Sequence, residues 1–214
     1  MAASGVLDLD VIRKSKLQRE PYEYLLGDHF VRAGAIADVQ KSFPDLRTPG
    51  FHPVDDMKLT GAFGEMIAEM KGPELAKALS DAFGMDFTKY PRFITVRKVS
   101  AAHEGRIHCD SESKVMSLLL YLNDGWSSPD GRLRVLRSQN SFEDYTTEID
   151  PKTGTIFAFL RSDHSWHGHK PFVGERRVVQ IAWLRSAEDA ARKTKRHRLS
   201  GFFKNLLAKP ERVN

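Results

Sequence analysis

Three widely separated residues in the second half of the chain have the side chains that a metal centre needs. His108 and Asp110 form a His-x-Asp pair, and a second histidine follows far downstream at His164, His167 or His169. Two imidazoles and one carboxylate on one face of a ferrous ion leave open positions for a co-substrate and oxygen. These residue types therefore predict a ferrous centre that carries out oxygen chemistry.

The spacing of the first pair suits a metal only if the chain is extended there. Residues two apart in a strand share a face, so His108 and Asp110 can reach one ion while Cys109 points to the other side. A chance His-x-Asp is expected in a sizeable minority of chains of this length, 214 residues, and the alternative is a hydrogen-bonded pair with no metal. A metal site needs a further ligand from elsewhere in the chain. The distal histidine must come from a distant strand that closes the barrel beside this pair.

Strand-like stretches follow one another after Pro91. The expected strands are 93–99, 115–122, 133–135, 146–149, 154–160 and 178–184. Many short strands joined by Gly, Pro and Asp turns after a helical section predict an α+β fold. Its core is expected to be a double-stranded β-helix, that is, a cupin-like jelly roll.

The first half of the chain is expected to add a layer of helices on one sheet. Residues 22–26 read as a first strand, and a helix is predicted from Asp28 to Phe43, stopped before Pro44. Two further amphipathic helices are expected, over 60–70 and from Pro73 to Gly84. Residues 1–20 are either a short helix or partly disordered.

We expect one domain over 1–185, helical to about residue 90 and jelly-roll from about 91, followed by a basic tail over 186–214. From Arg185 onward, nine Lys or Arg stand against three Asp or Glu, a surplus of six. Since the whole chain carries +5, the body is left at about −1. The tail is predicted to form a basic amphipathic helix that contacts a membrane or a protein partner, or simply docks on the domain with its cations solvated.

Bulk composition narrows the class of protein. Hydrophobic residues make up 41% and charged residues 29%, as in a soluble globular protein, and no apolar run is long enough for a membrane span. The N-terminus lacks a signal-peptide pattern. The single cysteine, Cys109, excludes an internal disulfide and indicates a reducing compartment, so a cytoplasmic location is predicted. The near-neutral body offers no groove that would track phosphates, so no nucleic-acid partner is expected.

The stretch from Arg106 to Leu184 resembles the catalytic core of 2-oxoglutarate and Fe(II)-dependent oxygenases of the prolyl-4-hydroxylase-like group. The resemblance rests on His108-Cys109-Asp110, Leu120-Tyr121-Leu122-Asn123, Gly131-Arg132-Leu133-Arg134 and Trp166-His167-Gly168, followed by an arginine and Trp183. It implies that His167 is the distal ligand. His169 lies on the same strand face as His167 and is expected to line the pocket, and His164 is expected to belong to a turn.

The co-substrate needs a cation for its distal carboxylate, and a guanidinium suits it best. Arg176 and Arg177 both qualify. Alternation along a strand puts Arg177 on one face with Val179, Ile181 and Trp183, and Arg176 on the other face with Val178 and Gln180.

In the resembling group, the anchoring basic residue and a tryptophan six positions later both face the barrel interior. The resemblance therefore favours Arg177 and Trp183 as co-substrate residues, with the Tyr121 hydroxyl beside the same carboxylate and Leu119 as an apolar wall. Arg176 stays open as the anchor, because the segment from Pro171 to Gly174 is one residue shorter than in the group.

The activity implied by this resemblance uses Fe(II), 2-oxoglutarate and O2, releases succinate and CO2, and hydroxylates a peptidyl proline, an amino acid or another small metabolite. The carboxylate of Asp110 favours hydroxylation over halogenation. One alternative is a non-catalytic cupin-like metal-binding or sensor protein. Another is a different metal enzyme on the same barrel, which would not need an arginine on the last strand. The substrate and the oligomeric state are left open.

Overall fold

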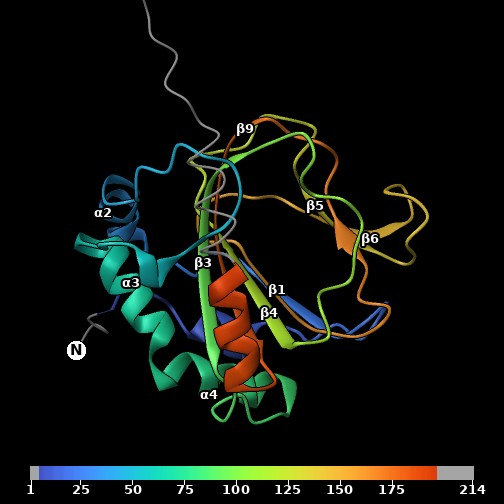
Figure 1. Cartoon of the computed structure of the whole chain (residues 1–214), viewed down its shortest axis with the longest axis horizontal. Coiled ribbons are helices and arrows are strands. Elements are labelled where there is room, and N and C mark those ends of the chain that lie inside the picture. The colour runs from blue at the N-terminus through green and yellow to red at the C-terminus, as the bar shows by residue number, and fades with distance from the viewer. Residues whose placement is uncertain (1–4, 197–214) are drawn as a thin grey trace, which may run out of the picture.

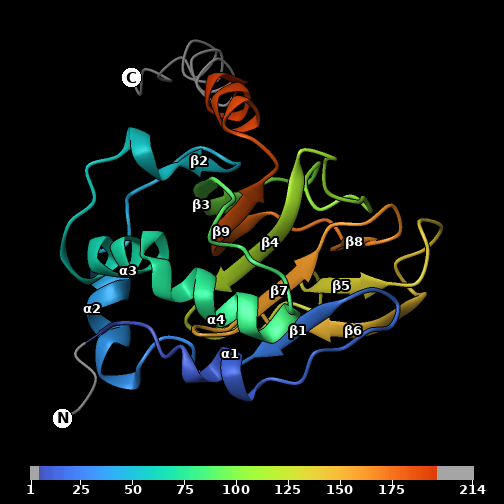
Figure 2. The ribbon, with the colours of Figure 1, turned by 90° about the horizontal axis from the view of Figure 1, so that it is seen from below.

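The computed structural model describes residues 5–196 and combines helices with two antiparallel sheets, which confirms the α+β class. The larger sheet has the strand order β1-β7-β4-β9-β3-β2 and the smaller one β6-β5-β8. Figure 2 shows the smaller sheet lying on one side of the larger one. The strands are β1 (Tyr24–Gly27), β2 (His52–Pro53), β3 (Arg92–Ser100), β4 (Lys114–Tyr121), β5 (Leu133–Leu136), β6 (Tyr145–Ile149), β7 (Ile156–Leu160), β8 (His167–Gly168) and β9 (Gly174–Leu184).

Helices cover the opposite side of the larger sheet, as both views show (Figures 1 and 2). The helical elements are α1 (Asp10–Lys14), η1 (Ala33–Ala35), α2 (Ile36–Lys41), η2 (Val54–Asp56), α3 (Gly61–Lys71) and α4 (Pro73–Phe83). Helix α4 begins at Pro73, whose fixed φ suits a first helical position, and it ends before Gly84, whose φ of 68° is left-handed. The predicted layer of helices on one sheet face is therefore confirmed.

Alternation along the strands of the larger sheet separates two cores. Side chains on the helix side form one apolar cluster with α1, α3 and α4. On β9 these are Val179, Ile181 and Trp183. Side chains on the other face, such as Tyr121, Phe157 and Val178, form a second cluster with β5 and β6 of the smaller sheet. The same strands thus contribute to two environments of different composition.

The helix predicted from Asp28 to Phe43 is wrong in its first part. His29 has a φ of 62°, which a right-handed helix cannot contain, and the buried Val31 pairs instead with Leu7 in an isolated bridge. Only the short η1 and α2 follow. The two-residue strand β2 was not expected, because two residues carry no recognisable period. The strand expected to carry the distal histidine is present as β8, although it is only two residues long.

A further helix over 187–196 follows β9 and packs on the face of the larger sheet that the smaller sheet also faces. Ala190 contacts the cluster of Phe93, Ala182 and Leu184. The Ser186 hydroxyl accepts from the backbone N–H of Asp189 at 3.1 Å and so caps the helix start. Residues 197–214 of the predicted tail lie outside the described residues. Within residues 5–196, the structure contains no helix of the length and apolarity that a bilayer crossing demands.

Candidate active site

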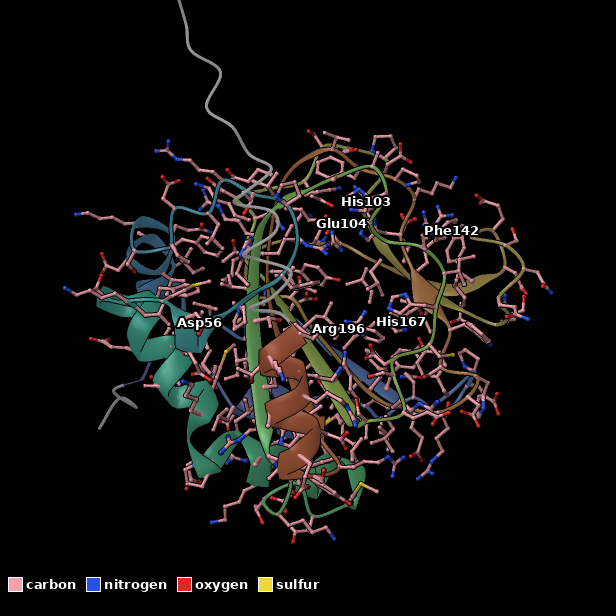
Figure 3. The ribbon with its side chains drawn as sticks, viewed as in Figure 1. Asp56, His103, Glu104, Phe142, His167 and Arg196 are labelled. Carbon is pink, nitrogen blue, oxygen red and sulfur yellow. The ribbon has the colours of Figure 1, made fainter. Side chains whose placement is uncertain are left out.

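The side chains of His108, Asp110 and His167 converge on one point, with one donor atom from each lying within 4.8 Å of the others. The backbones of His108 and His167 exchange two hydrogen bonds of 3.0 Å in an isolated antiparallel bridge. Their rings lie 4.4 Å apart between centroids. His108 is therefore held beside β8 by this bridge and not within a continuous strand, as the sequence had suggested. Figure 3 shows His167 in the space between the two sheets.

Backbone carbonyls fix the orientation of both imidazoles. The Nδ1–H of His108 donates to the carbonyl of Arg106 at 2.8 Å, and the Nδ1–H of His167 donates to the carbonyl of Ser165 at 2.9 Å. Each ring therefore presents Nε2 as its free lone pair. Outer hydrogen bonds of this kind set the tautomer and direction of metal-binding histidines.

The carboxylate of Asp110 is buried and ionised. Burial raises its pKa, but the charge of Lys114, the charge that His167 carries once it is protonated, and two hydrogen bonds lower the pKa by more, so that the net pKa lies well below the usual range. Lys114 Nζ donates to one oxygen at 2.6 Å and the Ser117 hydroxyl donates to the other at 2.5 Å. Each oxygen keeps a second lone pair, so the group can still ligate a cation.

Both buried histidines of this region are neutral near pH 7. Burial, followed by the neighbouring His108, lowers the pKa of His167 to about 4. Burial and the charge of Arg176 lower the pKa of His169, which lines the same pocket, to about 3. A neutral imidazole is the form that binds metal, so this donor set fits a ferrous ion.

The three residues open into a cavity of about 330 Å³ between the sheets. Phe93, Leu119 and Leu133 form its apolar walls. Its charged lining residues are Arg97, Asp110, Lys114, Arg176 and Lys193. A pocket with apolar walls and a few convergent polar groups is typical of a small-molecule site.

Two neighbouring buried polar groups, one of them the pocket-lining Arg176, each have an atom that no hydrogen-bond acceptor reaches. Arg176 is 1% exposed; its Nε–H donates to the carbonyl of Gly131 at 2.9 Å, but Nη2 is unpaired. The hydroxyl of the fully buried Tyr121 is also unpaired, and its ring centroid lies 5.3 Å from the Arg176 guanidinium carbon. Because buried polar groups are nearly always satisfied, this pair fits a missing acceptor such as a carboxylate.

The structure corrects the expected placement of two residues. Arg177 lies outside this pocket, where it contacts Gln40 and Glu175 and its guanidinium lies 5.1 Å from the Phe43 ring centroid. Trp183 is fully buried on the helix side, 6.0 Å from Phe87 between ring centroids. The physical reason is that the face of β9 carrying both residues packs against the helices.

The other expected residues lie near the site. Leu119 lines the cavity and Tyr121 belongs to the same sheet face. His169 lines the cavity as well, whereas His164 lies exposed in a turn.

Sequence reasoning missed Arg97, Lys114 and Lys193, and it ranked Arg176 second. One signal favoured Arg176: Gln180 is the one polar residue between Val178 and Leu184, and it shares the face of Arg176. A polar residue in an otherwise apolar strand marks the face that lines a site. Arg97 and the two lysines carry no such signal. They come from other parts of the chain, and only the tertiary structure brings them to the pocket.

The family model of the 2OG-Fe(II) oxygenase superfamily matches residues 94–185, the range that contains all three converging residues and Arg176. A search of curated protein sequences returns no significant match.

Several solved structures have a similar fold. A Pseudomonas putida prolyl-4-hydroxylase is 18% identical with a TM-score of 0.56, covering 84% of this chain and 97% of its own. A Phytophthora capsici prolyl 4-hydroxylase is 20% identical with a TM-score of 0.59, covering 86% and 64%. The viral collagen prolyl hydroxylase of Paramecium bursaria Chlorella virus-1, solved with 2OG, is 16% identical with a TM-score of 0.50, covering 76% and 96%. The predicted double-stranded β-helix is therefore confirmed.

Proposed function

We propose that this protein, whose residues 94–185 match the family model of the 2OG-Fe(II) oxygenase superfamily, is a member of that superfamily and hydroxylates a small-molecule or peptide substrate, with His108, Asp110 and His167 holding the iron. The observation that carries the assignment of residues is the convergence of the three donor groups within 4.8 Å in the cavity that Arg176 also lines. Ferrous iron, 2-oxoglutarate and oxygen supply the oxidising chemistry when bound, with release of succinate and CO2.

The protein's own residues bind and orient. His108 and His167 present Nε2 because their Nδ1–H groups are engaged by backbone carbonyls. Asp110 supplies a negative charge that needs no deprotonation at neutral pH, since its pKa lies below the usual range. Ser117 donates to that carboxylate at 2.5 Å and so restricts its rotation.

Arg176 and Tyr121 are proposed to bind the distal carboxylate of 2-oxoglutarate. Both have an unpaired polar atom in a buried setting, and a charge-assisted hydrogen bond is strong where water is excluded. The Gly131 carbonyl directs the guanidinium by accepting from its Nε–H. Leu119 and Leu133 keep the surrounding wall apolar, which lowers the local dielectric.

The first test uses purified protein with Fe(II) and 2-oxoglutarate under anaerobic conditions. We expect the absorption band of iron-chelated 2-oxoglutarate in the wild type and its loss in His108→Ala and Asp110→Ala. Their Fe(II) affinity should fall by more than the roughly 10–100-fold that changes behind a ligand cost. His164→Ala is the matched control, since His164 is an exposed turn residue close in sequence to His167.

Admitting oxygen completes the test, with succinate release as the measurement. Absence of the band in the wild type would refute the proposed function. A band without succinate, across peptides, amino acids and small acids, would indicate the alternative of a metal-binding or sensor protein.

A further inference from the structure

The charges that line the pocket sum to a positive value even when the metal and the co-substrate are included. This inference rests on the proposed function, which supplies both groups. Four cations line it, Arg97, Lys114, Arg176 and Lys193. Two carboxylates oppose them, that of Asp110 in the lining and that of Glu104, which lies 2.9 Å from Arg97. Fe(II) and doubly ionised 2-oxoglutarate cancel each other, so two positive charges remain for the substrate to meet.

Three of the four cations already have an electrostatic partner or a role. Arg97 pairs with Glu104, and Lys114 Nζ lies 2.6 Å from Asp110. Arg176 is proposed above to bind the co-substrate. Lys193 is the exception, because no carboxylate of residues 5–196 forms an ion pair with it and its Nζ contacts only the Ser111 hydroxyl, at 3.1 Å.

Lys193 reaches the pocket because of how the chain continues after β9. The helix over 187–196 packs through Ala190 on Phe93, Ala182 and Leu184, on the sheet face that forms the pocket wall. In Figure 1 this helix passes in front of β3 and β4. Ser111, which Lys193 contacts, adjoins Asp110 in the chain, so the ammonium lies at the metal end of the cavity.

The carboxylates near Lys193 do not balance the burial of its ammonium group and the cations beside it. Burial lowers its pKa first, and the positive charges of Lys114 and Arg196 lower it further; the carboxylates of Asp110 and Asp189 oppose this shift without reversing it. A bound anion would oppose both effects, because it would pair with two ammonium groups that now repel each other. An oxyanion is the ligand that fits, since ammonium groups bind carboxylates and phosphates as point charges.

We infer that the substrate carries a carboxylate or phosphate, and that Lys193 binds this group at the metal end of the pocket. The cavity of about 330 Å³ lies at the low end of small-ligand sites and also has to hold 2-oxoglutarate, so a small molecule fits better than a bulky one. Lys193 is thus a specificity-determining residue, contributed by an element outside the two sheets.

The test measures anion binding directly, with the full chain loaded with Mn(II) and 2-oxoglutarate. Inorganic phosphate and propionate are the probes. Their binding is detected by the paramagnetic relaxation that Mn(II) causes in the phosphorus nucleus of phosphate and in the carboxyl carbon of propionate. We expect saturable relaxation of at least one probe in the wild type. Lys193→Gln should weaken that binding by about tenfold or more, and Lys193→Arg should retain most of it, because the charge is kept. Lys195→Gln, exposed on the same helix, is the control and should leave binding unchanged.

Each result decides the inference. Relaxation of phosphate alone or of propionate alone identifies the oxyanion. No relaxation of either probe in the wild type, or equal binding in Lys193→Gln, would overturn it. The absorption band of the Fe(II) complex with 2-oxoglutarate, recorded with and without each probe, tests the proposed function separately. It should persist in Lys193→Gln.

Discussion

The two faces of β9 differ in what they contribute to the protein. Toward the helices the strand presents Val179, Ile181 and Trp183, each fully buried in an apolar cluster. Toward the smaller sheet it presents Arg176, Gln180 and Ala182, which line the cavity. Adjacent residues of one strand therefore stabilise the fold on one side and form the site on the other.

This comparison separates stability from chemistry. The helix side is a packed apolar cluster in which each lost contact leaves a cavity, and its unpaired polar atom is the neutral Nε1–H of Trp183. The pocket side contains a buried guanidinium with an unpaired Nη2, a feature that costs stability unless a ligand pairs with it. Substitutions on the two faces should accordingly be measurable in different experiments.

The largest effect is expected from Trp183→Ala. Removing this fully buried ring should lower the free energy of unfolding by about 3–5 kcal/mol, as large-to-small core substitutions do. Urea unfolding of the metal-free protein would measure it. Gln180→Ala, on the opposite face of the same strand, should cost less than about 1 kcal/mol. Equal losses for the two variants would contradict the distinction between the faces.

Arg176→Leu should have the opposite profile. We expect 2-oxoglutarate to bind about 100-fold more weakly, equivalent to about 2.7 kcal/mol, because the distal carboxylate loses its cation. The free energy of unfolding should stay the same or rise, because a buried and incompletely paired charge is removed. Titration of the iron–2-oxoglutarate absorption band and urea unfolding are the two measurements.

Arg177→Leu is the matched variant one residue along the strand. It should leave 2-oxoglutarate affinity within about twofold and lower stability by less than about 1 kcal/mol, since the ion pair with Glu175 is partly exposed. If Arg177→Leu and not Arg176→Leu weakened 2-oxoglutarate binding, the co-substrate would be bound on the other face.

A smaller effect is expected at Gly131, whose carbonyl accepts from Arg176. A Cβ there would lie 2.7 Å from the Trp126 ring and 2.9 Å from the Phe172 ring, at a φ of 79°. Gly131→Ala should cost about 1–2 kcal/mol for the backbone alone and displace the carbonyl, which weakens 2-oxoglutarate binding by roughly tenfold.

Gly125→Ala is the control for this variant, because Gly125 also has a φ of 79° but open space at its Cβ position. It should show the backbone cost and leave 2-oxoglutarate affinity unchanged. The same loss of affinity in both variants would mean that the Gly131 carbonyl does not position Arg176.

Much of the fold could be predicted from local pattern. The strands around Ile94, Leu118 and Phe157 show as β-branched and apolar runs, and α4 shows in its starting Pro73 and closing Gly84. The helix expected from Asp28 failed because the left-handed backbone of His29 and the pairing of Val31 with Leu7 come from tertiary contacts.

The sequence by itself determined the residue types of the centre, the succession of the main strands along the chain, and the fact that Arg176 and Arg177 face opposite ways. Only the tertiary structure decided which of the two faces the cavity, and it placed Trp183 among the helices and Lys193 in the pocket. The reason is physical. Alternation along a strand fixes which side chains share a face, whereas the element packed against each face decides which of the two faces lines the cavity and which is buried against the helices.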